Sequence, residues 1–248
     1  MTDPLALAGG GTALLFGLVF GSFVTAASYR LPRGVSVVSG RSACPACGHG
    51  LTARDLVPLV SWLAARGRCR HCGAPVSWRY PLIELATGAL FVLAWARADD
   101  PLQAVVLAGL VVGLMIMTVA DLECGIIPDA VHVGLAPLAL AWHWLGDWAP
   151  MDMAGGAVLG AGLGLGLRLG FRRIRGYDGL GLGDVKFLAV AGLWLGLGGL
   201  APFLVLAGAA GLGLGLGWRL SGRGRVFPFG PALALALLAG VLFPGMSR

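Results

Sequence analysis

The sequence contains a series of long apolar segments with few charges, and this series constrains the fold more than any other feature. About 20 consecutive apolar residues are needed to cross the hydrocarbon core of a bilayer. We place such segments near residues 5–28, 82–98, 102–120, 126–146, 153–170, 184–199, 200–218 and 228–244. The composition agrees, because 57% of the residues are hydrophobic and only 12% are charged, about half the charged share of a soluble domain. The sequence therefore predicts an all-α polytopic membrane protein with about eight transmembrane helices.

Residues 29–81 depart from this pattern. They are rich in arginine, cysteine and proline, and they contain no apolar run long enough to span a membrane. We therefore expect three parts: a first transmembrane helix at residues 1–28, a small polar domain at 29–81, and a membrane domain of seven helices at 82–248.

The distribution of charge predicts the orientation of these helices, because Lys and Arg are retained on the cytoplasmic side. With the N-terminus outside, the inward segments hold all of the 18 Lys and Arg residues except Arg97 and Arg248. No basic stretch precedes the first apolar segment, so we expect a retained helix there and no cleavable signal. The net charge of +6 then reflects topology and contact with anionic lipid. We expect no nucleic-acid partner, since no basic and aromatic stripe accompanies the charge.

Glycine is abundant, with 42 residues, and part of it repeats every four positions. Gly162, Gly166 and Gly170 form such a series, and small residues at this spacing let helix backbones approach closely in lipid. We therefore expect these three glycines to lie at a helix interface. The Gly-rich stretch near Gly181 follows no predicted strand, so it is not a dinucleotide-binding motif.

Four cysteines form two C-x2-C pairs in the polar domain. The pairs are Cys44 with Cys47 and Cys69 with Cys72, an arrangement typical of tetrahedral zinc. Disulfides are the alternative, but the predicted cytoplasmic location is reducing. Four cysteines complete the coordination shell, so the zinc is expected to be structural.

Three further residues offer donor or nucleophilic groups near these pairs or near a membrane segment. His49 and His71 adjoin the cysteine pairs and are expected to be bystanders. Cys124 is unpaired, and we interpret it as a packing residue.

Six acidic residues lie in or beside the apolar segments on the predicted cytoplasmic side, and ionisable groups at membrane depth are costly and often functional. They are Glu84, Asp121, Glu123, Asp129, Asp178 and Asp184. Asp121 ends the third segment and Asp184 begins the sixth, so helix packing can bring them face to face. Two carboxylates that share a site resist ionising together, so one keeps a proton while the other accepts one from water. This is the chemistry of an aspartic protease.

Each of these acids also has a structural interpretation. Asp129 and Asp184 stand at helix starts, where a carboxylate stabilises the N-terminus. Glu123 and Asp178 fit solvated loop charges. Glu84 is expected either to pair with an arginine or to line a binding cavity.

Several ordered motifs resemble those of the type IV prepilin peptidase family, the prepilin leader peptidase/N-methyltransferases among the GxGD aspartic peptidases. In sequence order they are GSF at 21–23, YRLP at 29–32, the two CxxC pairs, DLVPLVSWLAARGRCRHC ending at Cys72, SWRYPLIELATG, the Asp121 segment with IPD, GLGD at 181–184 followed by Lys186, and FPFGPALALA. The resemblance implies eight membrane helices, an inserted cytoplasmic zinc-binding domain, and catalytic aspartates at Asp121 and Asp184.

The resemblance also implies substrates and a second activity. Family members cut the basic leader from type IV prepilins or type II secretion pseudopilins and then methylate the new N-terminus with S-adenosylmethionine. Gly181 and Gly183 would allow the substrate backbone to approach Asp184. Lys186 is expected to hold an acidic group of the substrate, to act on Asp184, or to be an ordinary snorkelling lysine. The residues that bind the methyl donor cannot be placed from the sequence.

The expected location is the bacterial cytoplasmic (inner) membrane, with the zinc-binding domain and the active site facing the cytoplasm. Alternatives remain open: a peptidase without methyltransferase activity, a non-catalytic membrane scaffold for pilus assembly, or a transporter whose acids relay protons. Against a transporter, no inverted repeat is apparent and the acids gather at one membrane face.

Overall fold

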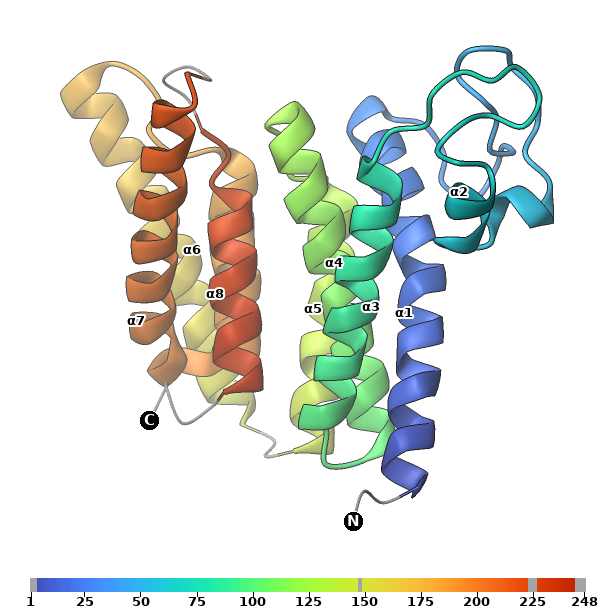
Figure 1. Cartoon of the computed structure of the whole chain (residues 1–248). Helices are drawn as coiled ribbons and strands as arrows, with labels where there is room; N and C mark the ends of the chain where they lie inside the picture. Colours follow the sequence, from blue (N-terminus) through green and yellow to red (C-terminus); the bar gives the residue numbers. More distant parts are fainter. Residues whose placement is uncertain (1–3, 147–148, 223–226, 244–248) are drawn as a thin grey trace. The chain divides into compact units, whose positions relative to one another are not determined.

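The structure is a computed structural model of the chain, and it describes residues 4–146, 149–222 and 227–243. The described residues form helices joined by loops, together with two isolated β-bridges, Ala43 with Gly50 and Arg68 with Pro75. The helices are α1 (Pro4–Arg30), η1 (Leu31–Arg33), η2 (Ala53–Leu56), α2 (Val60–Ala64), α3 (Arg79–Arg97), α4 (Pro101–Cys124), α5 (Asp129–Leu145), α6 (Pro150–Arg175), α7 (Leu182–Leu220) and α8 (Gly230–Leu242). The expected all-α fold is confirmed for these residues (Figure 1).

The chain divides into two units, residues 1–116 and residues 117–248. The first unit holds α1 to α3 and most of α4, and the second holds the last residues of α4 together with α5 to α8. Helix α4 begins after Asp100, whose Oδ1 accepts hydrogen bonds from the N–H groups of Leu102 and Gln103. This is the usual stabilisation of a helix start by an N-terminal aspartate.

In the first unit, α1 and α3 pack against each other over much of their length (Figure 1). Glycines on α1 make this close approach possible. A Cβ atom added at Gly21 would lie 2.6 Å from Glu84 Cα, and one added at Gly17 would lie 2.7 Å from Gly88 Cα. The packing therefore brings the end of α1 against the first turns of α3, where Glu84 stands.

In the second unit, α6 packs on α7 through a row of glycines. A Cβ atom at Gly164 would lie 3.1 Å from Val185 Cα, and Cβ atoms at Gly156 and Gly160 would collide with the backbone of α7. The expectation that Gly162, Gly166 and Gly170 form the interface is wrong, because nothing lies within 4 Å of a Cβ atom added at any of them.

The physical reason is that α6 carries two interleaved four-residue glycine series. Successive residues of an α-helix are turned by about 100°, so a shift of two residues moves a series to nearly the opposite face. Both series satisfy the spacing rule for close helix packing. The rule cannot tell which face meets a neighbour, and the series with Gly156, Gly160 and Gly164 does so here.

Helix α7 spans 39 residues but is broken at Gly196, whose φ of 65° and ψ of −172° are not helical. An unbroken helix of this length would measure about 58 Å, nearly twice the thickness of a bilayer core. A Cβ atom at Gly196 would strike the Asp152 carboxylate, so the break requires glycine for space as well as for φ. Asp152 Oδ1 accepts a hydrogen bond from Leu197 N at 3.1 Å, which caps the second half of α7.

The contacts of α8 show that the chain reverses direction at this break. Leu195, just before the break, lies against Gly240 near the end of α8. Gly211 and Gly215, in the second half of α7, lie against Phe229 and Phe227 at the start of α8. The start of α7 is also near the start of α8, because Asp184 in the first turn of α7 interacts with Asp121, and Asp121 contacts Gly230 at the start of α8. Both ends of α7 therefore lie beside the beginning of α8, and α7 provides two antiparallel helices.

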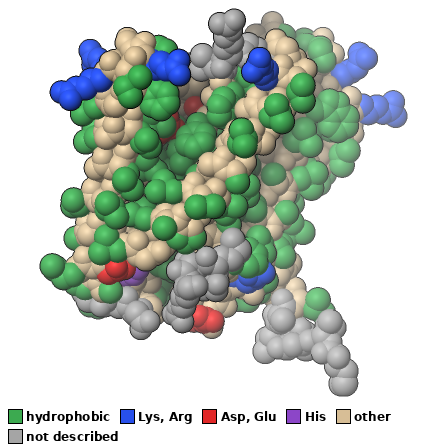
Figure 2. Space-filling view, turned by 90° about the vertical axis from the view of Figure 1, so that its left-hand side faces the viewer, with side chains coloured by type: hydrophobic (Ala, Val, Ile, Leu, Met, Phe, Trp, Pro, Cys, Tyr) green, Lys and Arg blue, Asp and Glu red, His purple; other side chains and the backbone are tan. Residues whose placement is uncertain are grey.

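Four helical elements are long and apolar enough to cross a membrane: Leu7–Arg33, Pro101–Cys124, Pro150–Arg175 and Leu182–Leu220. Each of the segments predicted to span overlaps a helix, with α7 supplying two, but the count of eight spans stays a prediction. On the face in Figure 2, hydrophobic side chains predominate and most of the Lys and Arg side chains in view lie along the upper edge. Three arginines, Arg172, Arg173 and Arg175, end α6.

Candidate functional site

Asp121 lies near the end of α4 and faces the start of α8. Its Oδ2 accepts a hydrogen bond from the backbone N–H of Gly230 at 2.7 Å, and the residue is only 7% exposed. Gly230 is the first residue of α8 and Pro231 follows it, so the N–H is one that no intrahelical partner can satisfy. The carboxylate of Asp121 thus satisfies a free backbone N–H at the start of a helix more than 100 residues away in sequence.

Asp184 lies in the first turn of α7, is partly exposed, and is close enough to Asp121 for their charges to interact. Its Oδ2 accepts a hydrogen bond from Gly181 N at 3.1 Å. The structure therefore brings the two predicted aspartates together within the second unit. Each carboxylate has one oxygen held by a backbone N–H group at a helix start, and its second oxygen makes no hydrogen bond among the described residues.

Gly181 and Gly183 precede Asp184 and leave little room for a side chain at either position. A Cβ atom at Gly181 would lie 2.9 Å from Asp184 Oδ2, and one at Gly183 would lie 3.0 Å from Ile127 Cβ. Neither glycine has a positive φ. Their role in this structure is to let the Asp184 carboxylate and the Ile127 side chain approach the loop backbone.

Two side chains that sequence reasoning did not assign hold the loop before Asp184. Arg168 of α6 forms an ion pair with Asp178 and donates a hydrogen bond to the Leu180 carbonyl at 2.7 Å. His132 of α5 is buried, and its Nε2 lies 3.1 Å from the Gly183 carbonyl. A carbonyl only accepts, so Nε2 carries the proton and donates. Asp178, expected to be a solvated charge, is therefore half of an ion pair.

Lys186 pairs with Asp129 of α5. Its Nζ donates to Asp129 Oδ1 at 2.6 Å, with 50% and 71% of the two side chains exposed. Asp129 also lies in the first turn of α5, as expected for a residue that stabilises the helix start. An exposed pair of this kind contributes little to stability, about 0–1 kcal/mol, but it links the start of α5 to the start of α7.

The four cysteines of the polar domain form one cluster in the first unit. Their sulfur atoms all lie within 4.8 Å of one another, and Cys44 Sγ and Cys72 Sγ are 3.9 Å apart. Four sulfurs bound tetrahedrally at about 2.3 Å from one zinc ion would be about 3.8 Å apart. A disulfide would need about 2.05 Å, and the cysteines are free. The donor set and its spacing therefore fit zinc.

The two C-x2-C segments adopt the same local fold. In each, the N–H of the fifth residue donates to the carbonyl of the first: Gly48 to Cys44 and Gly73 to Cys69, both at 2.9 Å. Both glycines have positive φ, 70° and 74°, which a residue with a side chain rarely adopts. Hydrogen bonds from the backbone of Cys47 and Ala46 lower the pKa of the Cys44 thiol to about 7, favouring the thiolate that binds metal at this position. The backbone of Ala74 lowers the pKa of the Cys72 thiol, but burial and the neighbouring cysteines outweigh it and raise that pKa to about 11.

The two histidines beside the cysteine pairs, the fifth cysteine and Glu84 are not part of this cluster. His49 and His71 stack on each other, with ring centroids 4.3 Å apart. Cys124 ends α4 in the second unit. Glu84 is buried in the first unit, where its Oε2 accepts a hydrogen bond from Leu59 N at 2.8 Å. Glu84 lines a cavity, which is one of the two roles expected for it.

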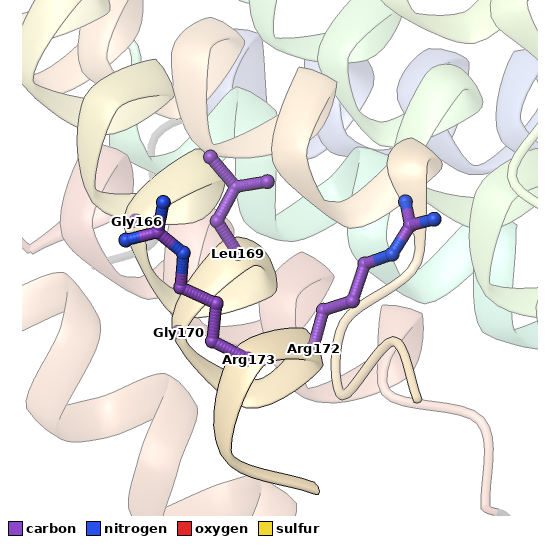
Figure 3. A pocket seen from close by; sticks show the side chains of 5 residues that line it. All are labelled: Gly166, Leu169, Gly170, Arg172 and Arg173. Carbon is purple, nitrogen blue, oxygen red and sulfur yellow. The ribbon is translucent and has the colours of Figure 1, made fainter. Parts of the chain in front are cut away.

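A second cavity, of about 580 Å³, lies along the end of α6 and is lined by Gly166, Leu169, Gly170, Arg172 and Arg173. The arginine side chains extend to either side of it (Figure 3). The lining contains no carboxylate or other group that exchanges a proton at neutral pH, since arginine stays protonated, so this cavity is not the candidate active site.

The functional residues missed by sequence reasoning are those whose partners are distant in the chain. Gly230 lies within the FPFG motif, whose glycine and proline mark a helix start, but nothing in the motif indicates Asp121 as its partner. His132 and Arg168 stand within helical segments and carry no local signal.

Comparison with known proteins agrees with the family resemblance of the sequence motifs. The profile of the Bacterial Peptidase A24 N-terminal domain matches residues 15–98, and that of the Type IV leader peptidase family matches residues 108–216. A prepilin leader peptidase/N-methyltransferase of Burkholderia pseudomallei (strain K96243) is 36% identical, covering 93% of this chain and 84% of the relative. Proteins of the same name from Aeromonas hydrophila and Bacillus subtilis (strain 168) are 36% and 34% identical, covering 90% and 92% of this chain and 86% and 92% of theirs.

No solved structure matches the chain. The family relationship therefore rests on sequence similarity, which extends over most of the chain and most of each relative. The chain belongs to the type IV leader peptidase family and is a peptidase.

Proposed function

We propose that this protein is a membrane aspartic endopeptidase that removes the leader peptide of type IV prepilins or type II secretion pseudopilins at the cytoplasmic face. We further propose that it methylates the new N-terminus with S-adenosylmethionine. The observation that carries the first part is the proximity of Asp121 and Asp184, whose charges interact and each of which has one oxygen held by a backbone N–H.

The fixed oxygens leave the second oxygen of each carboxylate available for proton transfer. In the proposed reaction one carboxylate accepts a proton from water, whose oxygen attacks the scissile carbonyl. The other carboxyl, protonated, donates a hydrogen bond to that carbonyl and later gives its proton to the departing amine as the C–N bond breaks. Both carboxyl groups must be present, because one accepts the proton from water while the other holds the proton that the departing amine receives.

The Cys44, Cys47, Cys69 and Cys72 cluster would hold a structural zinc ion. Four protein ligands fill a tetrahedral shell and leave no position for water or substrate, so the metal would support the polar domain and take no part in peptide hydrolysis. We place this domain and both aspartates on the cytoplasmic side of the inner membrane, in an N-out topology of eight spans, because the Lys and Arg residues are concentrated there.

The test is leader cleavage by the purified protein in detergent, with a prepilin as substrate and the released leader followed on a gel. Asp121→Asn and Asp184→Asn are each expected to abolish cleavage. Asp99→Asn, the same chemical change in the loop between α3 and α4, is the matched control and is expected to cut normally. Undiminished cleavage by either active-site variant would refute the assignment.

Adding labelled S-adenosylmethionine to the same assay tests the second activity. Label on the mature substrate supports the bifunctional enzyme. Complete cleavage without label would favour a peptidase without methyltransferase activity.

A further inference from the structure

The first unit contains a cavity of about 480 Å³ that the peptidase reaction does not use. It is bounded by the end of α1, the start of α3 and the polar domain, and Cys44 and Cys69 are among its lining residues. This volume falls in the range of about 300–1,000 Å³ typical of small-molecule sites. The chemistry of its wall therefore indicates what it can bind.

The wall contains a buried carboxylate, that of Glu84. The residue is 6% exposed, and its described donors are neutral: the Leu59 N–H at 2.8 Å and the Ser22 hydroxyl. Leu59 has a φ of 59°, rare for a residue with a branched side chain. A buried carboxylate is costly unless a positive charge or several donors compensate it. Its position at a cavity wall favours a ligand that carries a positive charge.

Two other groups at the cavity are held rigidly. Trp62 of α2 donates from Nε1 to the Val76 carbonyl at 3.1 Å, and its ring packs on Trp78 at 4.1 Å between centroids. Arg79 donates to Ser28 Oγ at 2.9 Å and to the Thr25 carbonyl at 3.3 Å. A fixed indole can stack with a planar base, and a guanidinium pairs with a carboxylate.

These groups match the parts of one compound class. S-adenosylmethionine supplies an electrophilic methyl group on a sulfonium sulfur, and it also carries a purine, an ammonium and a carboxylate. We propose that this cavity binds S-adenosylmethionine, with Glu84 facing its sulfonium, Trp62 beside the purine and the arginines of the wall near its carboxylate. This inference rests on the methyl transfer proposed above, and it places that activity on residues distinct from Asp121 and Asp184.

The test measures binding directly on the full chain in detergent, by titration calorimetry with S-adenosylmethionine and with S-adenosylhomocysteine, which has a neutral thioether in place of the sulfonium and keeps the ammonium and the carboxylate. Glu84→Gln is expected to weaken S-adenosylmethionine binding about tenfold or more and S-adenosylhomocysteine binding much less, because only the former carries the sulfonium charge. Glu123→Gln is the matched control, and both variants are expected to cleave a prepilin. Equal binding of S-adenosylmethionine by Glu84→Gln and the wild type would overturn the proposal.

A second measurement covers the case in which Glu84→Gln fails to fold, as judged by lost leader cleavage. Wild-type protein is irradiated with labelled S-adenosylmethionine, and the labelled peptide is mapped. Label within residues 22–84 supports the cavity, and label confined to residues 117–248 overturns it. If the wild type neither binds the compound nor transfers its methyl group, the proposed methyltransferase function fails. Wild-type binding that is unchanged in Glu84→Gln refutes only the site.

Discussion

The carboxylate of Asp121 accepts the backbone N–H of Gly230 at 2.7 Å, which joins the end of α4 to the first residue of α8. The contact is tight, because a Cβ atom at Gly230 would lie 2.7 Å from Asp121 Oδ2 and 3.1 Å from Asp121 Cβ. Position 230 must therefore lack a side chain for Asp121 to keep its place.

Gly230→Ala is expected to lower leader cleavage strongly, by about 10- to 100-fold, because displacement of a catalytic group by about 1 Å can cost this much. Alanine retains the N–H donor and favours helix, so the effect would come from displacement of Asp121. Initial rates at saturating prepilin provide the measurement.

Gly213→Ala is the matched control, since nothing lies within 4 Å of a Cβ atom there. We expect it to cleave at the wild-type rate. Full activity of Gly230→Ala would mean that the observed contact does not position Asp121 for the reaction.

His132 is expected to act as a positioning residue through the Gly183 carbonyl, 3.1 Å from its Nε2. His132→Phe removes the donor while filling the space, and it should lower kcat about tenfold or more with little change in KM. His132→Gln places an amide N–H near the position of Nε2 and should recover much of the loss. A general packing role predicts no such recovery, so two equally impaired variants would argue against positioning.

The order and approximate bounds of the helices could be predicted from the sequence because apolar length and charge placement are local properties. The sequence predicts a boundary between two spans at residues 199 and 200, for example, and the chain reverses close by, at Gly196. The face that a helix presents is not local. The spacing therefore predicts an interface at Gly162, Gly166 and Gly170, whereas the neighbouring glycine series of α6 makes the contact.

The same distinction applies to the candidate site. Asp121 and Asp184 could be selected because a carboxylate beside an apolar segment is unusual in itself. The cysteine cluster was predictable because its ligands recur at short spacing within one domain. His132 and Arg168 each bond a backbone carbonyl elsewhere in the chain, and the N–H of Gly230 donates to a distant carboxylate. Their roles depend on tertiary packing, which no spacing rule specifies.

Metal analysis of the purified protein is expected to find about one zinc per chain. Cys44→Ser and Cys72→Ser should each lose the metal and destabilise the polar domain, because a domain of this size has a thin core of its own. Cys124→Ser, outside the cluster, should retain the metal. Metal-free protein that stays folded and active would refute a structural zinc.

The two glycine series of α6 allow a paired test of the helix interface. A Cβ atom at Gly160 would collide with the Leu188 carbonyl oxygen and lie 2.9 Å from its carbon, both backbone atoms of α7, whereas Gly162 faces open space. Gly160→Ala should therefore destabilise the protein by about 1–3 kcal/mol, the usual cost of overpacking. Gly162→Ala should be neutral or gain up to about 1 kcal/mol from helix propensity. Thermal unfolding in detergent compares the two variants, and a larger loss for Gly162→Ala would place the interface on the other face of α6.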